Sequence, residues 1–462
     1  MNIKSVLIAN RGEIAVRINR AAKALGLRTV QVYSAADADS LPVRLADEAI
    51  LIGPAAAKKS YLDIEAVIAA AKAAKVDAVH PGYGFLAENA DFADAVVAAG
   101  MTFVGPSGAS IRLLGDKVAA RAEAEKAGVP TVPGSGGRIA DVEEAAAIAT
   151  RIGFPVMIKA AAGGGGRGIR VAADLDEFTR QFPQASAEAA AAFGDGGLYI
   201  EKAVLAARHV EVQILGDGTS FVHCFERECS LQRRRQKVWE EAPAVGLPAT
   251  VRRKLCDSAV ALARSVGYSG AGTVEYLYDE ASQDFYFLEV NTRIQVEHPV
   301  TEMITGIDLV QEMLRIAGGE PLSLRQEDIS IHGHAIECRI NAEDPAKNFM
   351  PWPGVVSKLG IPAGEGVRFD TMLFDGYAVP PFYDSLLGKL VVHGADRADC
   401  LAKLGAALRS LKIEGIPTTI PLHAALAADA NVAAGAFHTR FLEGWLDTEF
   451  HAQADSAKEA AQ

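Results

Sequence analysis

Several signatures of common protein classes are missing from this chain of 462 residues. The five cysteines form no Cys-x-x-Cys pair and are odd in number, so a reduced, cytoplasmic setting is expected. The longest apolar runs fall short of the roughly 20 residues that a membrane helix needs, so no membrane span is expected. The N-terminus enters a strand-like run without the layout of a signal peptide.

Positive charge is also scarce. With 46 Lys and Arg against 58 Asp and Glu, the net charge is −12 and the pI is about 5.4, which argues against nucleic-acid binding. A basic run such as residues 233–235 is therefore interpreted as a local site. Hydrophobic residues make up 50% of the chain, enough for a large core, and the length predicts about two to four domains.

Two nucleotide-binding fingerprints are absent as well. The turn at residues 9–13 holds a single glycine, so no nicotinamide cofactor is implied. The glycine-rich run at residues 163–168 is followed neither by the Lys-Ser/Thr pair of a P-loop nor by a helix. Successive glycines still let backbone N–H groups approach an anion, with Lys159 before them and Arg167 among them. We interpret the run as a loop of hairpin type that covers phosphates; the alternative is a merely flexible loop.

The hydrophobic periodicity divides the chain into regions. The first third alternates strands (residues 5–10, 29–34, 78–80 and 102–105) with helices (13–25 and 66–75), which predicts a doubly wound parallel sheet. A second region carries a helix at 119–128, a linker at 129–134, and strands at 154–160 and 169–171. A third begins near His334, with strands around 335–340, 355–359 and 389–393 and a helix near 396–411. The tail from residue 451 carries no recognisable chemistry.

Two acids lie in apolar, strand-like segments joined by a polar connection. Glu275 lies in residues 272–277, and Glu289 follows in residues 287–289. An antiparallel strand pair would set the two carboxylates side by side, and Asn291 adds a third oxygen ligand. Because Mg²⁺ favours one or two protein carboxylates plus phosphate oxygens, we predict a metal site. The alternative is that either acid forms a buried ion pair with a neighbouring arginine.

The run of residues 287–299 changes abruptly from apolar to densely charged, which is costly unless a ligand pairs the charges. If the chain stays extended, alternate side chains share one face: Glu289, Asn291, Arg293, Gln295 and Glu297. That face offers oxygens for a cation, then donors for an anion, then a possible base. Lys237 is a second anion donor, although charged runs like 232–237 are more often solvated surface. His209, alone on an alternating strand, is more often structural.

These residues and further motifs resemble the biotin carboxylase family, the ATP-grasp component of biotin-dependent carboxylases such as acetyl-CoA carboxylase. The resemblance runs from about residue 2 to about residue 446. It rests on these segments: residues 8–15, 80–89, Lys159 with 163–170, 208–213, 232–237, 291–302 and 337–345.

The resemblance implies an α/β and α+β architecture. The N-terminal α/β domain would span residues 1–117, and the ATP-grasp domain 118–333, with a mobile lid at about 131–203. A C-terminal α+β domain at 334–446 and a tail at 447–462 would follow.

The resemblance also implies a role for each matched position. Lys117 and Lys159 would hold ATP phosphates under a loop that includes Gly164, Gly165, Gly166, Arg167 and Gly168. The rest of the nucleotide and cofactor site would comprise Glu201, Lys202, His209, Gln232, Leu277 and Tyr83, with Glu201 at the adenine end. Glu275, Glu289 and Asn291 would bind Mg²⁺ or Mn²⁺. Bicarbonate would lie against Lys237, Arg293, Gln295 and Val296. Glu297 would deprotonate it, and Arg339 would stabilise the biotin enolate.

The implied enzyme is a ligase that forms a carbon–nitrogen bond. It would use ATP and bicarbonate to carboxylate biotin through carboxyphosphate, giving carboxybiotin, ADP and phosphate. Because no Ala-Met-Lys-Met biotinylation motif is found, biotin is expected on a separate carrier protein, with a separate carboxyltransferase and a homodimeric enzyme. Acetyl-CoA carboxylase, and hence fatty acid biosynthesis, is the expected context; other acyl-CoA or non-CoA acceptors stay open.

Three positions depart from the family pattern. Arg235 stands where the family usually has His, Trp239 where it has Val or a similar aliphatic residue, and Trp352 where it has a small residue. Two other functions compete with biotin carboxylation. One is an ATP-grasp ligase with a different acceptor, which the cluster from Arg293 to Glu297 together with Arg339 disfavours. The other is an inactive nucleotide-sensing subunit, which the retention of every metal, bicarbonate and base position disfavours.

Overall fold

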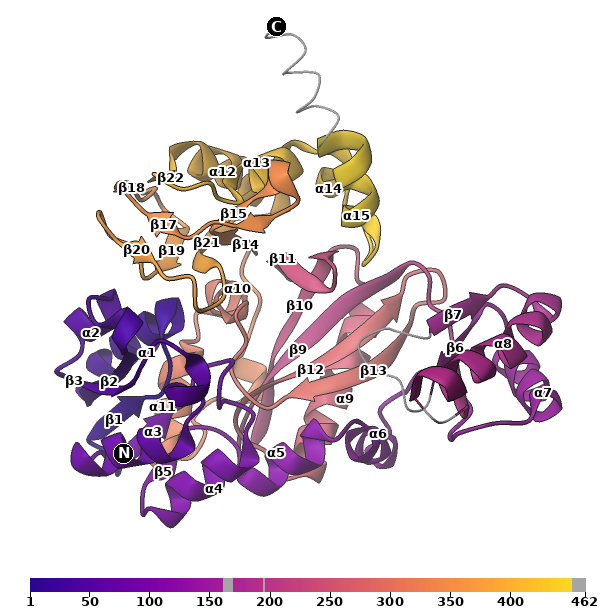
Figure 1. The fold of residues 1–462 in the computed structure, drawn as a ribbon, viewed down its shortest axis with the longest axis horizontal. Helices are drawn as coiled ribbons and strands as arrows, with labels where there is room; N and C mark the ends of the chain where they lie inside the picture. Colours follow the sequence, from indigo (N-terminus) through magenta and orange to yellow (C-terminus); the bar gives the residue numbers. More distant parts are fainter. Residues whose placement is uncertain (161–168, 194–195, 451–462) are drawn as a thin grey trace, which may run out of the picture. The chain divides into compact units, whose positions relative to one another are not determined.

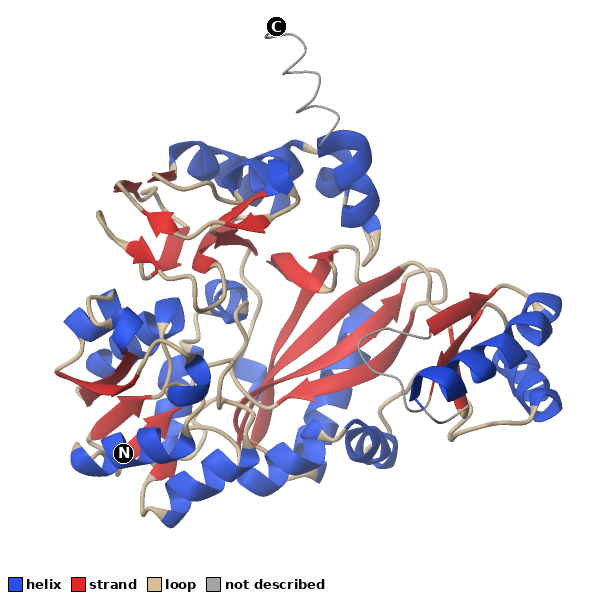
Figure 2. Ribbon diagram, in the orientation of Figure 1, coloured by secondary structure: helices blue, strands red, loops and turns tan. Residues whose placement is uncertain are grey.

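The computed structural model describes residues 1–160, 169–193 and 196–450. The chain forms two compact units (Figures 1 and 2). The first comprises Met1–Val129, Arg208–Tyr276 and the chain from Glu289 onward; the second comprises Pro130–Ala207 and Leu277–Leu288. The glycine-rich loop and the tail from residue 451 lie outside the described residues.

The first unit opens with the predicted parallel sheet. Its strand order is β3-β2-β1-β4-β5, formed by β1 (Ser5–Ile8), β2 (Arg28–Ser34), β3 (Glu48–Gly53), β4 (Ala78–His80) and β5 (Thr102–Phe103). Alternate residues of β1 enter two different apolar clusters, Val6 and Ile8 in one and Leu7 in the other. The sheet is therefore buried on both faces, as a doubly wound parallel sheet requires. The helices of this region are α1 (Gly12–Ala24), α2 (Leu41–Leu45), α3 (Ile64–Ala73), α4 (Ala90–Ala98), α5 (Gly108–Gly115) and α6 (Lys117–Lys126).

An eight-stranded sheet forms the framework of the candidate site. Its order is β13-β12-β9-β10-β11-β14-β21-β19. The strands are β9 (Ala207–Asp217), β10 (Phe221–Arg233), β11 (Gln236–Ala242), β12 (Ser269–Asp279), β13 (Asp284–Asn291), β14 (His334–Asn341), β19 (Val367–Thr371) and β21 (Leu386–Gly394). The pairing of β11 with β14 joins strands from the second and third regions of the sequence. The first unit also contains three helices from this part of the sequence: α9 (Ala249–Ser265), α10 (His298–Thr305) and α11 (Leu309–Ala317).

The C-terminal part adds helices to this sheet: α12 (Arg397–Ser410), α13 (Ile420–Ala428), α14 (Ala430–Ala434) and α15 (Phe441–Trp445), followed by a turn of π-helix at Leu446–Phe450. Short strands complete it: β15 (Glu343–Asp344), β16 (Met350–Pro351), β17 (Gly354–Val355), β18 (Lys358–Gly360), β20 (Ala378–Val379) and β22 (Lys412–Glu414). The single strand predicted at 355–359 is thus wrong in detail, because β17 and β18 pair with different partners.

The second unit is a small two-layer structure. Its strands run in the order β7-β6-β8, from β6 (Val156–Ala160), β7 (Ile169–Ala172) and β8 (Leu198–Lys202), with helices α7 (Val142–Ile152) and α8 (Leu175–Phe193). Val156, Ile158 and Ala160 are buried in the apolar cluster that the helices share, while Met157 and Lys159 between them are half-buried. The helices therefore cover one face of this sheet, and the other face carries Lys159.

Among the described residues, no helix combines the length and the apolar composition that a membrane crossing would demand.

Candidate active site

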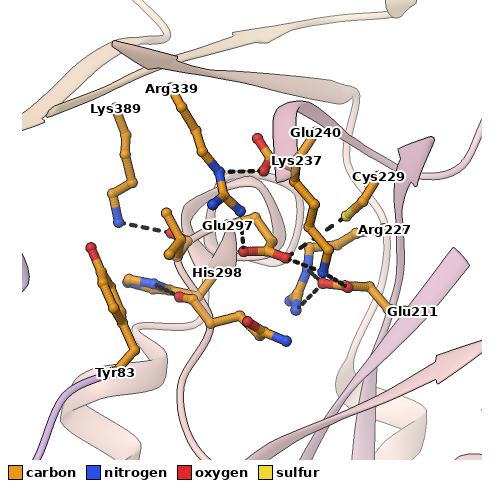
Figure 3. A network of polar contacts seen from close by, with 12 residues as sticks. Tyr83, Glu211, Arg227, Cys229, Lys237, Glu240, Glu297, His298, Arg339 and Lys389 are labelled. Atoms are coloured by element: carbon orange, nitrogen blue, oxygen red, sulfur yellow. Dashed lines mark hydrogen bonds and ion pairs between the residues drawn. The ribbon is translucent and has the colours of Figure 1, made fainter. Parts of the chain in front are cut away.

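A network of buried charges lies on the eight-stranded sheet and centres on Lys237 of β11 (Figure 3). The Lys237 ammonium lies 2.6 Å from a Glu211 oxygen, 2.9 Å from Glu275 and 2.7 Å from Glu297. Burial alone would lower the pKa of Lys237, but these carboxylates outweigh it and raise the pKa well above its usual value. One permanent cation thus holds three carboxylates together.

Glu297 links this cation to Arg339 of β14. One carboxylate oxygen of Glu297 contacts Lys237, and the other accepts a hydrogen bond from Arg339 Nη2 at 2.9 Å. Burial would raise the pKa of Glu297, but Lys237 and Arg339 outweigh it and lower the pKa. The side chain is therefore an ionised, fully buried carboxylate.

Arg339 is held from a second side by Glu240. Its Nε donates to Glu240 Oε1 at 2.6 Å, and 19% of its side chain stays exposed. Burial raises the pKa of Glu240 to about 7, although Arg339 acts to lower it. The guanidinium is thus fixed between two carboxylates on a side chain that is partly exposed, which suits it to stabilise an anion that forms beside it.

The predicted metal ligands lie on the neighbouring strands β12 and β13, with Glu275 inside β12 and with Glu289 and Asn291 at the end of β13. Glu275 Oε1 accepts from Asn291 Nδ2 at 2.8 Å. Burial raises the pKa of the half-buried Glu289, and the nearby Glu275 carboxylate raises it further. The two neighbouring carboxylates repel each other, and a bound Mg²⁺ would reduce that repulsion. Together with the amide oxygen of Asn291, they therefore fit a divalent cation.

His209 lies beside this set rather than in an apolar core. Its Nε2 is 3.0 Å from Glu275 Oε2, and its Nδ1 is 3.1 Å from Gln232 Nε2. Burial and Lys237 lower the pKa of His209, but Glu275 and Glu211 outweigh them and raise it to about 9. These contacts favour a role for His209 in the polar site over a purely structural role.

The run after Asn291 reaches the site by a turn, not by an extended strand. β13 ends at Asn291, and α10 begins at His298. Arg293 donates to Glu88 at 2.9 Å, to Gln295 Oε1 at 2.7 Å and to Asn291 Oδ1 at 3.1 Å. Of the five side chains expected to share one face of a strand, only Glu289 and Asn291 lie in β13. The turn that follows brings Glu297 to Lys237.

The remaining predicted residues of the first unit lie in three settings. Lys117 is exposed at the first position of α6. The Val296 carbonyl accepts from Lys389 Nζ at 2.8 Å. Tyr83 donates a short hydrogen bond to Glu13, which also pairs with Lys389 at 3.1 Å.

Three predicted residues of the second unit, Lys159, Glu201 and Lys202, lie on its small sheet. Lys159 forms a short ion pair with Glu201, across neighbouring strands. Lys202 donates to the carbonyls of Gly153 at 3.0 Å and Phe154 at 3.1 Å. Leu277 is half-buried in this unit. Gly164, Gly165, Gly166, Arg167 and Gly168 lie outside the described residues.

Sequence reasoning missed several members of the charged network. Glu211 lies two residues after His209 in β9, so the two side chains share one face of the strand, and this period of two was the available signal. Arg227, fully buried, donates to Glu211, Gln213, Thr301 and Thr273. Lys389 is fully buried in an apolar strand, and a lysine in such a strand was the signal for a paired charge.

Comparison with known proteins agrees with this geometry. The sequence profile of the biotin carboxylase N-terminal domain matches residues 2–111, and that of the biotin carboxylase C-terminal domain matches 337–444. Between them, the ATP binding domain of the carbamoyl-phosphate synthase L chain matches residues 116–325.

Curated relatives match along nearly the whole chain. Biotin carboxylase 1 of Bacillus subtilis is 53% identical over 442 residues, covering 96% of this chain and 98% of the relative. Biotin carboxylase of Pseudomonas aeruginosa is 54% identical over 451 residues, covering 97% and 100%.

Among solved structures, the biotin carboxylase domain of a thermophilic 2-oxoglutarate carboxylase bound to bicarbonate superposes with a TM-score of 0.91 at 44% identity. The match covers 96% of this chain and 98% of that one. The biotin carboxylase subunit of a pyruvate carboxylase gives a TM-score of 0.90 at 46% identity, with the same coverage. The chain is therefore an enzyme of the biotin carboxylase family.

Proposed function

We propose that this protein is a biotin carboxylase component that acts on biotin attached to a separate carrier protein, most simply within an acetyl-CoA carboxylase. The observation that carries the proposal is the chain of contacts from Glu275 through Lys237 and Glu297 to Arg339. It connects a metal-binding carboxylate, an anion-binding cation, a base and a second cation in one buried network.

The first step assigned to these residues is activation of bicarbonate. Lys237 would hold the anion, with Arg293, Gln295 and the Val296 segment beside it. Glu297 would accept its proton, because the ionised carboxylate is a base within reach of the same ammonium. The bicarbonate oxygen then attacks the γ-phosphorus of ATP, which gives carboxyphosphate and ADP.

Glu275, Glu289 and Asn291 would hold Mg²⁺ or Mn²⁺, which when bound neutralises phosphate charge during this transfer. Lys117 and Lys159 supply further cations for the phosphates, and Lys202, Glu201, His209, Gln232 and Leu277 complete the nucleotide site in this proposal. Agreement with this assignment comes from structural relatives described as bound to ADP and to bicarbonate.

The second step is carboxylation of biotin. Carboxyphosphate decomposes to CO₂ and phosphate, and the phosphate takes the proton from biotin N1′. The resulting enolate attacks CO₂ through N1′. The Arg339 guanidinium, fixed by Glu240 and Glu297, would stabilise the negative charge on the enolate oxygen. A separate carboxyltransferase would pass the carboxyl group to the final acceptor.

Stimulation of ATP hydrolysis by biotin tests the proposal. We expect hydrolysis in the presence of bicarbonate and Mg²⁺ to rise when free biotin or a biotinylated carrier is added, with carboxybiotin as product. No stimulation by either form would refute the proposal and favour an ATP-grasp ligase with a different acceptor.

A further inference from the structure

Arg339 lies on β14 just past the point where the pairing of β14 with β11 ends. β11 pairs with β14 from Ala242 opposite Ala335 to Trp239 opposite Cys338, so Arg339 lies one residue beyond this pairing. On its other side, β14 continues to pair with β21, where Arg339 is opposite Lys389. A central strand that loses one partner leaves backbone groups that need other hydrogen bonds.

Side chains at the start of α13 supply those bonds. The Arg339 carbonyl accepts from His423 Nε2 at 2.7 Å and from Thr419 Oγ1 at 2.9 Å, which uses both of its lone pairs. Two residues along the same edge, Asn341 N–H donates to Thr419 Oγ1 at 3.0 Å, and Thr419 N–H donates to the Asn341 carbonyl at 3.1 Å. The start of α13 thus takes the place of a neighbouring strand for β14.

His423 is itself held in place by packing. Its ring is fully buried, and burial lowers its pKa to about 4, so the imidazole is neutral at physiological pH. A carbonyl can only accept, so Nε2 carries the ring proton and donates. The Trp239 ring, 1% exposed, lies 6.5 Å from the His423 ring at an interplanar angle of 32°. Trp239 is also the β11 residue at which pairing with β14 ends.

We infer that His423 and Thr419, with Trp239 packed against the histidine ring, are positioning residues for Arg339: they fix its backbone so that its guanidinium meets the biotin enolate. This inference rests on the proposed role of Arg339. The Arg339 side chain has fixed partners at its far end, Glu240 and Glu297, and the α13 contacts fix the near end. The Trp239 ring is almost fully buried in an apolar cluster, so it contributes through packing and not through an exposed surface.

The inference predicts a selective defect in the use of biotin. With His423→Leu, kcat/KM for biotin should fall by about 10-fold, because a small displacement of a catalytic group is costly. ATP hydrolysis that depends on bicarbonate but not on biotin should stay within about twofold, because Lys237 still holds Glu297 when Arg339 is displaced. His423→Gln keeps an N–H donor of similar reach and should restore kcat/KM to within about threefold of the unmodified enzyme.

Two control variants separate the possible failures. Leu426→Ala removes a buried apolar side chain from the same helix but leaves the side chains that donate to the Arg339 carbonyl, so it should lower the melting temperature without a selective loss of biotin use. Arg339→Met should itself abolish biotin-dependent turnover. If Arg339→Met has no effect, the proposed function is wrong. If it does but His423→Leu lowers both activities equally, or His423→Gln is no better than His423→Leu, the positioning role is overturned.

Discussion

At the scale of single residues, the Lys237 ammonium balances three buried carboxylates that would otherwise repel one another. Lys237→Met leaves them without their shared cation, so we expect the free energy of unfolding to fall by about 3 kcal/mol or more. The pKa of Glu297 should rise, because Lys237 is the main group that lowers it. Urea unfolding measures the first effect, and ATP hydrolysis with bicarbonate should be lost in parallel. Lys403→Met, which removes an exposed ion pair with Asp399, is the matched control; an equal effect of both would contradict this account.

Glu289 provides a second test at this scale. Glu289→Gln removes one of the two carboxylates assigned to the metal and keeps the size of the side chain. We expect the Mg²⁺ concentration for half-maximal ATP hydrolysis to rise by about 10-fold, because Mg²⁺ binding depends on carboxylate charge. The exposed Glu327→Gln serves as control. An unchanged Mg²⁺ requirement in the Glu289 variant would remove Glu289 from the metal site.

The sequence identified individual charged residues of the site better than it identified the residues that they pair with. Glu275, Asn291, Lys237, Glu297 and Arg339 were found because each is a polar residue in a motif or an apolar strand. Arg227 was missed because its partner Glu211 lies opposite it only once β9 and β10 pair in this register, and Lys389 because its partner, the Val296 carbonyl, is far away in the sequence. Long-range pairing of this kind has no local periodicity that a sequence could show.

At the scale of secondary-structure elements, Glu241 joins β11, β14 and α12. Its carboxylate accepts from His334 at 2.8 Å and Arg397 at 2.7 Å. Burial alone would raise the pKa of Glu241, but these partners outweigh it and lower the pKa from 4.5 to about 2. Between these values the unfolded chain binds more protons, so this contribution to stability is full above about pH 4.5 and is lost as the pH falls toward 2.

Unfolding measured at two pH values tests this link between elements. Glu241→Gln should cost about 3 kcal/mol at pH 7, and its difference from the unmodified protein should shrink by about 1 kcal/mol at pH 4. Chemical denaturation at both pH values gives the two differences. Glu65→Gln, exposed on α3, should show no such change. A difference for Glu241→Gln that stays constant with pH would contradict the lowered pKa.

Elements with a clear period were predicted closely, since their pattern is local. The helix expected at 396–411 is α12 (Arg397–Ser410), and the strand expected at 335–340 is β14 (His334–Asn341). The end of β13 at Asn291 was not predicted, because the polar run beyond it alternates as a strand would. Tertiary contacts of the turn before α10, such as Glu297 with Lys237, decide where the strand stops.

At the scale of the whole molecule, the domain boundaries near residues 117 and 333, the lid motion and the homodimer stay predictions. If biotin is attached to a separate carrier protein, a further prediction follows. A biotinylated carrier protein should give a kcat/KM at least about 10-fold above that of free biotin, because binding energy from remote parts of a substrate is used at the reacting centre. Steady-state kinetics with both forms, and with unbiotinylated carrier as control, measure this. Equal values would argue against a carrier-bound substrate.

In the proposed mechanism Glu297, held between Lys237 and Arg339, is the base that deprotonates bicarbonate before biotin is carboxylated. Its most direct test is the transfer of label from radioactive bicarbonate to biotin by the unmodified enzyme and by Glu297→Gln, with ATP affinity measured alongside. We expect the variant to transfer label at least about 100-fold more slowly while still binding ATP. Transfer at nearly the unmodified rate would contradict it.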